Sequence, residues 1–529
     1  MAQDRSSAVV EEPADAARRI AQVRLERLPQ ADLGNGYYKN PVMVGPGSDN
    51  TVVRVGSDFY MMAGGGWPDQ LVWHSRDLVN WRPLTRALHK FQGHAWASDL
   101  IYHEGRFYIY TTQVDGQRGW TPELPNVARR SLMVGPHRLE GDPAFRNVVL
   151  WADDPRGPWS DPIDLQVYGY IDPGHVVDRE GNRYLFFSGG VLVPLAPDGL
   201  SVTGELKKVY EGWQYPAHWV VEGHCLEAPK PMFYNGWYYL SSAQGGTAGP
   251  STAHMGVIAR AKSPEGPWEN SPYNPIVHTY SREEKWWRQG HGTLIDDVEG
   301  NWWFLYTGYE QGYEEFSKQG LLLPIEWTDD GWPRVVWGVN VTDVIPMPAG
   351  ENVGHGMPLS DDFTASQIGI QWSYSPEIDP AQTFRVGNGE LVVRAGGASA
   401  LEAPGLAVMP LNHAYQAEIE LTISGGAETG LVLHGGRRGG GDWVSVSLRE
   451  GMLIAESNRL EDHTPYSGNH VFVRLRNDHH DVSCYYSADG KQWTPFARAF
   501  QVLTGRQLGT YAAGSGEARF RNFGYRGLE

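Results

Sequence analysis

The sequence predicts an all-β chain in which a five-bladed β-propeller is followed by a jelly-roll β-sandwich. Three observations support this fold. A glycine hairpin recurs five times, helical periodicity nearly disappears after residue 40, and a stretch rich in Pro and Gly separates two differently patterned regions. At 529 residues the chain is also too long for one compact core, which favours two domains.

Each of the five hairpins has an aromatic-rich strand that follows a glycine turn. The segments are RVGSDFYMM, YHEGRFYIYTT, DREGNRYLFF, FYNGWYYLSS and DVEGNWWFLY, with glycines at positions 56, 105, 181, 236 and 300. Consecutive glycines stand 49 to 76 residues apart, the length expected of one four-stranded blade with its loops. Turns that end in tryptophan, such as DDPRGPW and SPEGPW, fit the connection between the third and fourth strands.

The repeats also set the expected domain boundaries. We expect an N-terminal extension at 1–35, with at most a short amphipathic helix, and the propeller at 36–345. Residues 346–359 lie in a segment rich in Pro and Gly and are expected to form a linker. Residues 360–529 contain alternating strands such as QAEIELTI, WVSVSLRE and VFVRLRN, which indicate the sandwich.

Composition narrows the range of partners. The net charge is −18 and no basic stripe is visible, so nucleic acid and anionic membranes are poor partners. No run of about 18 apolar residues occurs, which argues against a membrane-spanning helix. The start lacks the apolar core of a signal peptide, so we expect a cytoplasmic protein, or a secreted one whose signal has been removed. The 21 Trp and 26 Tyr offer flat faces for an oligosaccharide, and a homo-oligomer remains open.

One ionisable residue stands in an otherwise apolar strand, six to nine residues before each hairpin glycine. These residues are Asp49, Asp99, Asp172, Glu227 and His291. The first strand of every blade lines the axis of a propeller, so we expect the five side chains to surround one pocket. Because hydrolysis of a glycosidic bond needs two carboxyl groups facing each other across a sugar, this ring indicates a glycoside hydrolase.

The order of short motifs resembles glycoside hydrolase family 43. The motifs are SDNTV, WASD, YIDP, LEAPK, GHG and LLLPIEWTDDGW, and the resemblance covers about residues 38–340. It continues into LSDDF and IQWSY, which resemble the start of the concanavalin A-like sandwich that follows the propeller in many β-xylosidases of the family. The resemblance implies an inverting, exo-acting enzyme that releases xylose or arabinose from plant-type oligosaccharides.

The same resemblance assigns roles to three carboxyl groups. Asp49 matches the general base that activates water, and Glu227 matches the general acid that protonates the leaving oxygen. Asp172 matches a third carboxylate, whose charge holds up the pKa of the acid and helps to orient it. An inverting mechanism predicts that Asp49 and Glu227 stand about 6.5–9.5 Å apart, with room for a water molecule. Asn50 follows the base where the family usually has proline.

Five further residues are expected around the sugar. Trp67 and Trp96 match pocket aromatics, and Asp99 is a less specific substrate-binding candidate. His291 matches a histidine on the propeller axis that contacts a calcium or sodium ion through water; no other cofactor is implied. Lys318 stands where many relatives have an arginine that binds sugar hydroxyls, and the two side chains are not equivalent donors. A purely structural role remains open for His291 and both tryptophans.

Several alternatives remain open from the sequence alone. The same carboxyl groups serve other sugars, such as a galactofuranoside or a galactoside. A carbohydrate-binding propeller without turnover would need the aromatic residues but not the acids. A retaining propeller enzyme would use a carboxylate as the nucleophile, and the stereochemistry of its product would distinguish it. The sandwich could itself bind glycan through Trp372, Trp443 or Trp493, although such residues are also common in sandwich cores.

Overall fold

A computed structural model describes residues 13–45, 49–63, 71–88, 94–114, 145–375, 378–435 and 441–529. The described chain divides into two compact units. The first contains Gln30–Gly312 and Ser317–Gly354. The second contains residues 13–29, Tyr313–Phe316 and His355–Glu529. The change of unit after Gly354 falls inside the segment that the sequence indicates as a linker. Within the described residues, no helix is long and apolar enough to cross a membrane.

Among the described residues, the first unit contains five antiparallel sheets that correspond to the predicted blades, four of them with four strands and one with five. The first sheet contains β2 (Thr51–Val55), β3 (Asp58–Ala63), β4 (Leu71–Ser75) and β5 (Arg82–Arg86). The second contains β6 (His94–His103), β7 (Arg106–Val114), β8 (Phe145–Ala152) and β9 (Ile163–Tyr168). The third contains β10 (Gly174–Val177), β11 (Arg183–Phe187), β12 (Val191–Pro194) and β13 (Lys207–Lys208), with a 3-10 turn at Ser188–Gly190.

The remaining two sheets follow the same order. The fourth contains β14 (Glu227–Tyr234), β15 (Trp237–Gln244), β16 (Met255–Ala261) and β17 (Glu269–Asn270), and β18 (Val277–His278) also pairs with β16. The fifth contains β19 (Trp286–Asp296), β20 (Trp302–Glu310), β21 (Lys318–Trp327) and β22 (Pro333–Val335). Another 3-10 turn lies at Glu314–Phe316.

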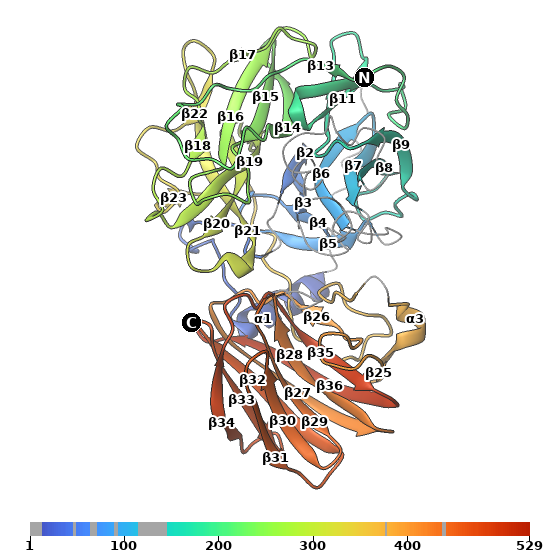
Figure 1. Cartoon of the computed structure of the whole chain (residues 1–529). Helices are drawn as coiled ribbons and strands as arrows, with labels where there is room; N and C mark the ends of the chain where they lie inside the picture. Colours follow the sequence, from blue (N-terminus) through green and yellow to red (C-terminus); the bar gives the residue numbers. More distant parts are fainter. Residues whose placement is uncertain are drawn as a thin grey trace. The chain divides into compact units, whose positions relative to one another are not determined.

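The five sheets form a closed ring, so the first unit is a five-bladed β-propeller. The first strands contact one another in the order β2, β6, β10, β14 and β19, and β19 contacts β2 again. Figure 1 shows β2, β6, β14 and β19 toward the middle of this unit. All five hairpin glycines have a positive φ, between 64° and 89°, at the turn between the first and second strands. These turns explain why the sequence repeat marks the blades.

The tryptophan turns also lie where the sequence predicts them. They connect the third and fourth strands of the first, second, fourth and fifth blades, and they end at Trp81, Trp159, Trp268 and Trp332. In two of them the indole nitrogen donates to a backbone carbonyl four residues earlier, from Trp159 to Pro155 and from Trp268 to Pro264. These two tryptophans therefore each close their own turn through a hydrogen bond of the indole nitrogen.

The segment that precedes the first blade is tied to the last one. β1 (Tyr37–Lys39) pairs with β23 (Val344–Pro346), which follows the fifth blade. The side chain of Asn40 donates to the Leu322 carbonyl at 3.0 Å and accepts from the Leu322 amide at 2.8 Å. The ring is thus fastened where its first and last blades meet.

The second unit is a β-sandwich. One sheet has seven strands in the order β24 (Phe384–Gly387), β25 (Glu390–Arg394), β36 (Glu517–Gly527), β27 (Ala414–Ser424), β32 (His470–Asp478), β33 (Asp481–Ser487) and β34 (Thr494–Gln501). The other has six in the order β26 (Ala407–Val408), β35 (Gln507–Gly514), β28 (Ala427–His434), β29 (Trp443–Arg449), β30 (Met452–Ser457) and β31 (Glu461–Pro465). The short helix α3 (Pro380–Thr383) precedes β24.

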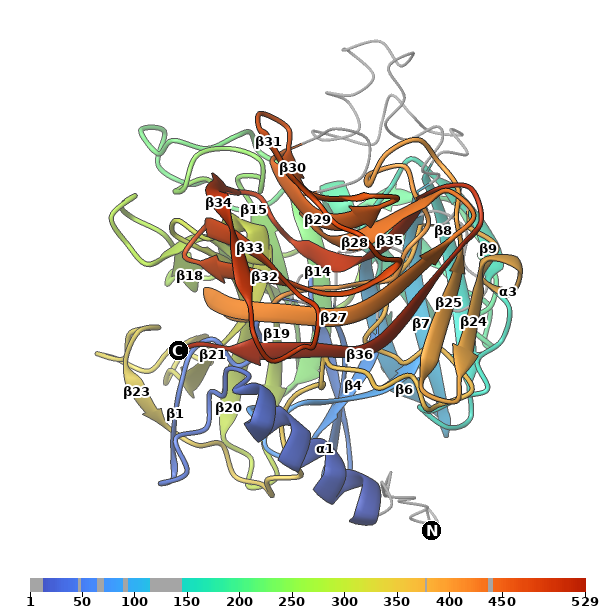
Figure 2. The ribbon, with the colours of Figure 1, turned by 90° about the horizontal axis from the view of Figure 1, so that it is seen from below.

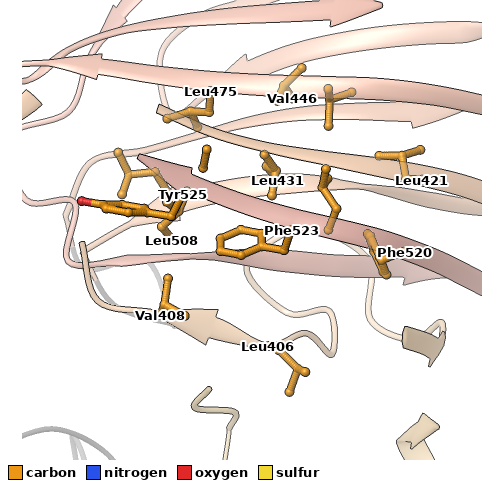
Figure 3. Packing of buried hydrophobic residues seen from close by; sticks show 14 of the residues in the cluster. Leu406, Val408, Leu421, Leu431, Val446, Leu475, Leu508, Phe520, Phe523 and Tyr525 are labelled. Carbon is orange, nitrogen blue, oxygen red and sulfur yellow. The ribbon is translucent and has the colours of Figure 1, made fainter. Parts of the chain in front are cut away.

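Apolar side chains from both sheets fill the sandwich core. Leu431 and Val446 come from the six-stranded sheet, and Leu475 and Phe520 come from the seven-stranded one (Figure 3). Trp372, one of the three candidate glycan-binding residues of this unit, is buried in the same core. Its burial makes it a packing residue rather than a surface for sugar.

Helix α1 (Pro13–Glu26) differs from the expected N-terminal extension. It contacts β36 and belongs to the sandwich unit (Figure 2). Val23 is part of the sandwich core, and the Glu26 carboxylate accepts hydrogen bonds from the amides of Leu359 and Ser360 at 2.7 and 3.0 Å. The apolar face of this helix was visible in the sequence, but its distant partner was not.

Candidate active site

A bend recurs near the beginning of the first strand of each blade or within that strand. Five residues, one per blade, have left-handed φ angles between 31° and 58°: Asp49, Ala97, Asp172, Ala228 and His291. In three blades the pairing register also breaks at this point, between Trp96 and Asp99, between Glu227 and Lys230, and between Gly290 and Thr293. Such a conformation costs a non-glycine residue on the order of 1 kcal/mol or more. Bulges of this kind redirect side chains and are common beside active sites.

The bends bring the three predicted catalytic carboxyl groups to one site. The charges of Glu227 and Asp49 both raise the pKa of Asp172. The same two charges also raise the pKa of Lys318. These groups come from four different blades, so they meet only because the propeller closes. The site is therefore a compact cluster of three carboxyl groups and one ammonium group.

Asp49 is held as a carboxylate. Its side chain is 20% exposed, Lys318 Nζ donates a hydrogen bond to its Oδ1, and His291 Nδ1 lies 3.3 Å from the same oxygen. Burial alone would raise the pKa of Asp49, but the charges of Lys318 and His291 outweigh this effect and lower the pKa to about 2. Asp49 is consequently ionised at neutral pH.

Asp172 is the buried carboxyl group of the cluster. Its Oδ2 accepts a hydrogen bond from the Ala228 amide at 3.0 Å, next to Glu227 in the chain. Burial, then the charge of Glu227 and then that of Asp49, raise the pKa of Asp172 to about 8. The third blade thereby places a proton-binding group directly beside the fourth blade's glutamate.

Glu227 is the carboxyl group of this pair that reaches solvent. It opens β14, its side chain is 16% exposed, and its Oε1 lies 3.2 Å from His254 Nε2. The sequence predicts that Asp172 raises the pKa of Glu227, whereas the structure raises the pKa of Asp172. The proton retained near neutral pH therefore lies on Asp172, directly beside Glu227, and Glu227 is the more exposed of the two carboxyl groups.

Lys318 occupies a different position from the one expected for a sugar-binding residue. It begins β21, is almost fully buried, and directs its ammonium group at Asp49. Burial lowers the pKa of Lys318, but the charge of Asp49 outweighs this and raises it above its ordinary value. Lys318 is thus a fixed positive charge that holds the base; its contact with sugar hydroxyls stays a prediction.

Asp99 is not placed to bind a sugar, which corrects the sequence prediction. Its side chain is 7% exposed, and both of its oxygens bind groups from other blades. Oδ1 accepts hydrogen bonds from Lys230 Nζ and Thr51 Oγ1, each at 3.0 Å, and Oδ2 accepts one from the His175 amide at 2.8 Å. Asp99 therefore ties the first strands of four blades together.

His291 lies beside Asp49, and its contact with an ion on the propeller axis stays a prediction. The ring is buried, and its Nε2 has no hydrogen-bond partner among the described residues. Burial lowers the pKa of His291 well below its usual range; Asp49 opposes this shift, while Lys318 and Lys230 add to it. In the described part of the chain no three His, Cys, Asp or Glu residues cluster as metal ligands.

The two predicted pocket tryptophans have different outcomes. Trp96 is partly buried at the bulge of β6 and packs edge-on against Phe145, with ring centroids 5.6 Å apart. This position agrees with a pocket wall, and its contact with a sugar stays a prediction. Trp67 lies outside the described residues.

Two buried residues that contact predicted site residues were missed in the sequence. Lys230 stands in the LEAPK motif, but nothing in the motif indicated that its ammonium group would be buried against Asp99. His254 directly precedes β16, is fully buried, and contacts Glu227. The pattern of one polar residue per first strand could not find it, because it comes from the third strand of its blade.

The chain is similar to known proteins in both sequence and structure. The profile of Glycosyl hydrolases family 43 matches residues 38–333, which is more than half of the chain. The structure of the GH43 BlXynB protein from Bacillus licheniformis superposes with a TM-score of 0.78 at 24% identity, covering 93% of this chain and 100% of that one. This likeness extends through both units and shows a shared fold.

Two curated relatives are 28% identical to this chain. The first is a non-reducing end alpha-L-arabinofuranosidase, BoGH43B, of Bacteroides ovatus, and its alignment covers 66% of this chain and 63% of the relative. The second is a xylan 1,3-beta-xylosidase of a Vibrio species, and its alignment covers 61% of this chain and 62% of the relative. The chain thus spans less than two thirds of the length of these relatives.

Proposed function

Because the chain belongs to glycosyl hydrolase family 43, we propose that it is an inverting, exo-acting glycoside hydrolase that releases xylose or arabinose from plant-type oligosaccharides. The names of its relatives support these sugars: one is an arabinofuranosidase that acts at non-reducing ends, and the other is a xylosidase. The retaining alternative and the binding-only alternative have no comparable support.

One observation carries the proposal, namely that three carboxyl groups lie together in different environments. The Lys318 ammonium group donates to Asp49 and keeps it ionised, whereas burial and the charges of Glu227 and Asp49 keep a proton on Asp172, which accepts from the amide next to Glu227. Acid and base catalysis in one step requires one carboxylate and one carboxylic acid at the same pH. A protein that only binds sugars has no use for this division.

The reaction follows from these states. A water molecule attacks the anomeric carbon and gives a proton to Asp49, while the bond between that carbon and the glycosidic oxygen breaks. The departing oxygen takes a proton from Glu227, which becomes a carboxylate. Asp172 positions Glu227 and favours return of the proton. Both transfers use carboxyl groups and water, so the proposed reaction needs no organic cofactor.

The test is hydrolysis of nitrophenyl β-D-xyloside and nitrophenyl α-L-arabinofuranoside by the wild type and by Asp49→Asn. The wild type should hydrolyse at least one substrate, and Asp49→Asn should lose about 10³-fold or more in kcat, because no carboxylate remains to take the proton from water. Asp329→Asn, which lies in a surface turn, serves as the matched control and should keep wild-type activity.

Hydrolysis that survives in Asp49→Asn would refute the assignment of the base. A folded wild type that hydrolyses neither glycoside would instead direct the search to a galactofuranoside or a galactoside. Binding of sugars with no hydrolysis of any of these glycosides would contradict the proposed function.

A further inference from the structure

A long irregular segment leads into the strand that carries the proposed acid. Residues 209–226 connect β13 with β14 and contain no helix or strand, whereas the corresponding connection between the second and third blades has only residues 169–173. Ordered connections longer than about 12–15 residues are uncommon in compact domains and usually serve a function. Trp213 and Trp219 lie in this segment, and both are only half-buried. The blade itself does not need these side chains, so they require another explanation.

The strand register places this segment next to the acid. Glu227 pairs with Ala243 on β15, so Gln244 is one residue further along that strand. The amide of Trp213 donates to Gln244 Oε1 at 2.7 Å, and its carbonyl accepts from Gln244 Nε2 at 3.2 Å. A single side chain thus holds both backbone groups of Trp213. It stands in the row of paired residues adjacent to the row that contains Glu227.

The same row leads to a stack of aromatic rings. It continues through Met255 on β16 to His278 on β18. The indole of Trp219 lies parallel to the ring of His278, with centroids 4.2 Å apart, and stands edge-on to Trp213, with centroids 5.9 Å apart. Tyr280 is perpendicular to both rings of the stack. Strands β14, β15, β16 and β18 follow one another outward from the axis (Figure 1), so the rings extend outward from the acid along the fourth blade.

Part of this aromatic group is in contact with solvent. Tyr280 is 66% exposed, and Val220, next to Trp219 in the chain, is 64% exposed. Exposed apolar side chains that gather in one place commonly mark a ligand-binding groove. The faces of a sugar ring present C–H groups, and aromatic faces carry partial negative charge that attracts them. A row of such rings beside a glycosidase acid is therefore suited to sugars.

The segment is also fastened at its far end. The Glu222 amide donates to the Gly245 carbonyl at 2.9 Å, and Glu222 Oε2 accepts from the Ala248 amide at 2.7 Å. A Cβ atom at Gly246 would lie 2.3 Å from the same oxygen, so only glycine allows this contact. These contacts hold the segment in place before a ligand arrives, which reduces the entropy lost on binding.

We propose that Trp213, Trp219 and Tyr280 form an aromatic shelf that binds the leaving part of an oligosaccharide. The proposal rests on the function proposed above. The acid protonates the glycosidic oxygen, so the departing sugars lie on the side of Glu227, and water attacks from the opposite side beside Asp49. A row of rings that extends outward from Glu227 therefore meets sugars beyond the bond that breaks. The preferred substrates are then oligosaccharides with at least two sugars in the leaving part, rather than disaccharides.

The test measures kcat/KM against chain length. The substrates are the di-, tri- and tetrasaccharides of β-linked xylose or of α-linked arabinose, whichever the wild type hydrolyses. The wild type should gain about tenfold in kcat/KM from the disaccharide to the tetrasaccharide, because contacts with remote sugars lower the barrier. Trp219→Ala and Tyr280→Ala should each remove most of this gain and lower kcat/KM for the disaccharide at most about threefold.

A matched control uses another exposed aromatic residue of the propeller. Trp337 follows β22 and is 86% exposed, so Trp337→Ala should keep the gain with chain length. No gain in the wild type would overturn the proposal. Equal losses at every chain length would also overturn it, because a merely structural role would displace Glu227 and impair all substrates alike. If Trp219→Ala does not fold, Tyr280→Ala decides the question, since its side chain is mostly exposed.

A binding measurement separates the shelf from the proposed function. Failure of the wild type to hydrolyse any of these oligosaccharides would count against the function, whereas hydrolysis with no dependence on length would count against the shelf alone. In the first case, titration calorimetry with the two tetrasaccharides compares the wild type with Tyr280→Ala. A Kd about tenfold higher in the variant would support the shelf. Equal Kd values, or no binding by the wild type, would overturn it.

Discussion

The axis of the propeller and the core of the sandwich bury different groups. Among the strands of the propeller, ionisable side chains are buried with partners from other blades, as in the pair formed by Lys230 and Asp99. Within residues 378–435 and 441–529, no Asp, Glu, Lys or Arg side chain is buried, and the core contains aliphatic and aromatic residues (Figure 3). The sandwich core is stabilised by apolar packing, whereas the propeller buries charged side chains, whose desolvation is costly unless they are paired.

Lys230→Met breaks a buried ion pair and should have the largest effect. The change leaves the Asp99 carboxylate buried without its cation, so we expect the propeller to lose about 3–5 kcal/mol of unfolding free energy. Differential scanning calorimetry measures the loss. Adding Asp99→Asn to the same chain should recover part of it, because the stranded charge is then gone. A loss below about 1 kcal/mol would contradict the buried pair.

Lys318→Met should impair catalysis and move the pH profile. The wild type should lose kcat/KM as pH rises through about 8, where Asp172 gives up its proton, and keep activity on the acid side until unfolding begins. Lys318 lowers the pKa of both Asp49 and Asp172. Its loss should therefore shift the acidic and the alkaline limbs of the pH profile of kcat/KM to higher pH. It should also lower the maximal rate about 100-fold.

The measurement is kcat/KM from about pH 4 to pH 10 with one nitrophenyl glycoside. Limbs that stay in place in Lys318→Met would show that the ammonium group does not set the protonation of the site. Lys207→Met, which removes an exposed lysine from the same propeller, should leave the profile unchanged.

Leu431→Ala probes the apolar core of the sandwich. It removes a fully buried side chain, so we expect a loss of about 2–5 kcal/mol of unfolding free energy with kcat unchanged for the folded protein. Calorimetry and activity measured at a temperature below the transition check both parts. Leu460→Ala, at an exposed position, is the matched control. A fall in kcat equal to that of Lys318→Met would refute the separation between the two regions.

Lys207→Met should have the smallest effect on stability. Its ion pair with Glu265 is exposed, with both side chains at least half accessible, so we expect a change below about 1 kcal/mol. The same calorimetric scan compares it directly with Lys230→Met. Equal losses in the two variants would mean that burial does not distinguish these lysines.

The sequence was sufficient to predict the blades, because each is marked by a local signal. A hairpin glycine with positive φ is required wherever a tight turn joins two strands, and five such turns stand at blade spacing. Asp49, Asp172 and Glu227 could be placed together for the same reason, since each stands at the beginning of a first strand. Helix α1 had a visible apolar face, but nothing local could indicate that it packs in the sandwich core.

Asp99 and His254 show where such counting fails. In the second blade the bend falls at Ala97, so Asp99 lies two residues beyond it and is buried against Lys230. A count back from the glycine cannot allow for a bulge whose place along the strand varies. His254 lies just before the third strand of the fourth blade and meets Glu227 across that same blade, so counting along first strands cannot find it.

The most direct test of the proposed mechanism is the stereochemistry of the first product. Proton NMR of the sugar released early in the reaction, before mutarotation, reports which anomer forms. An ionised Asp49 that activates water opposite a protonated Glu227 predicts inversion, so a β-xyloside should first give α-xylose. A first product with the β configuration would require a covalent intermediate and would contradict the roles of Asp49 as base and Glu227 as acid.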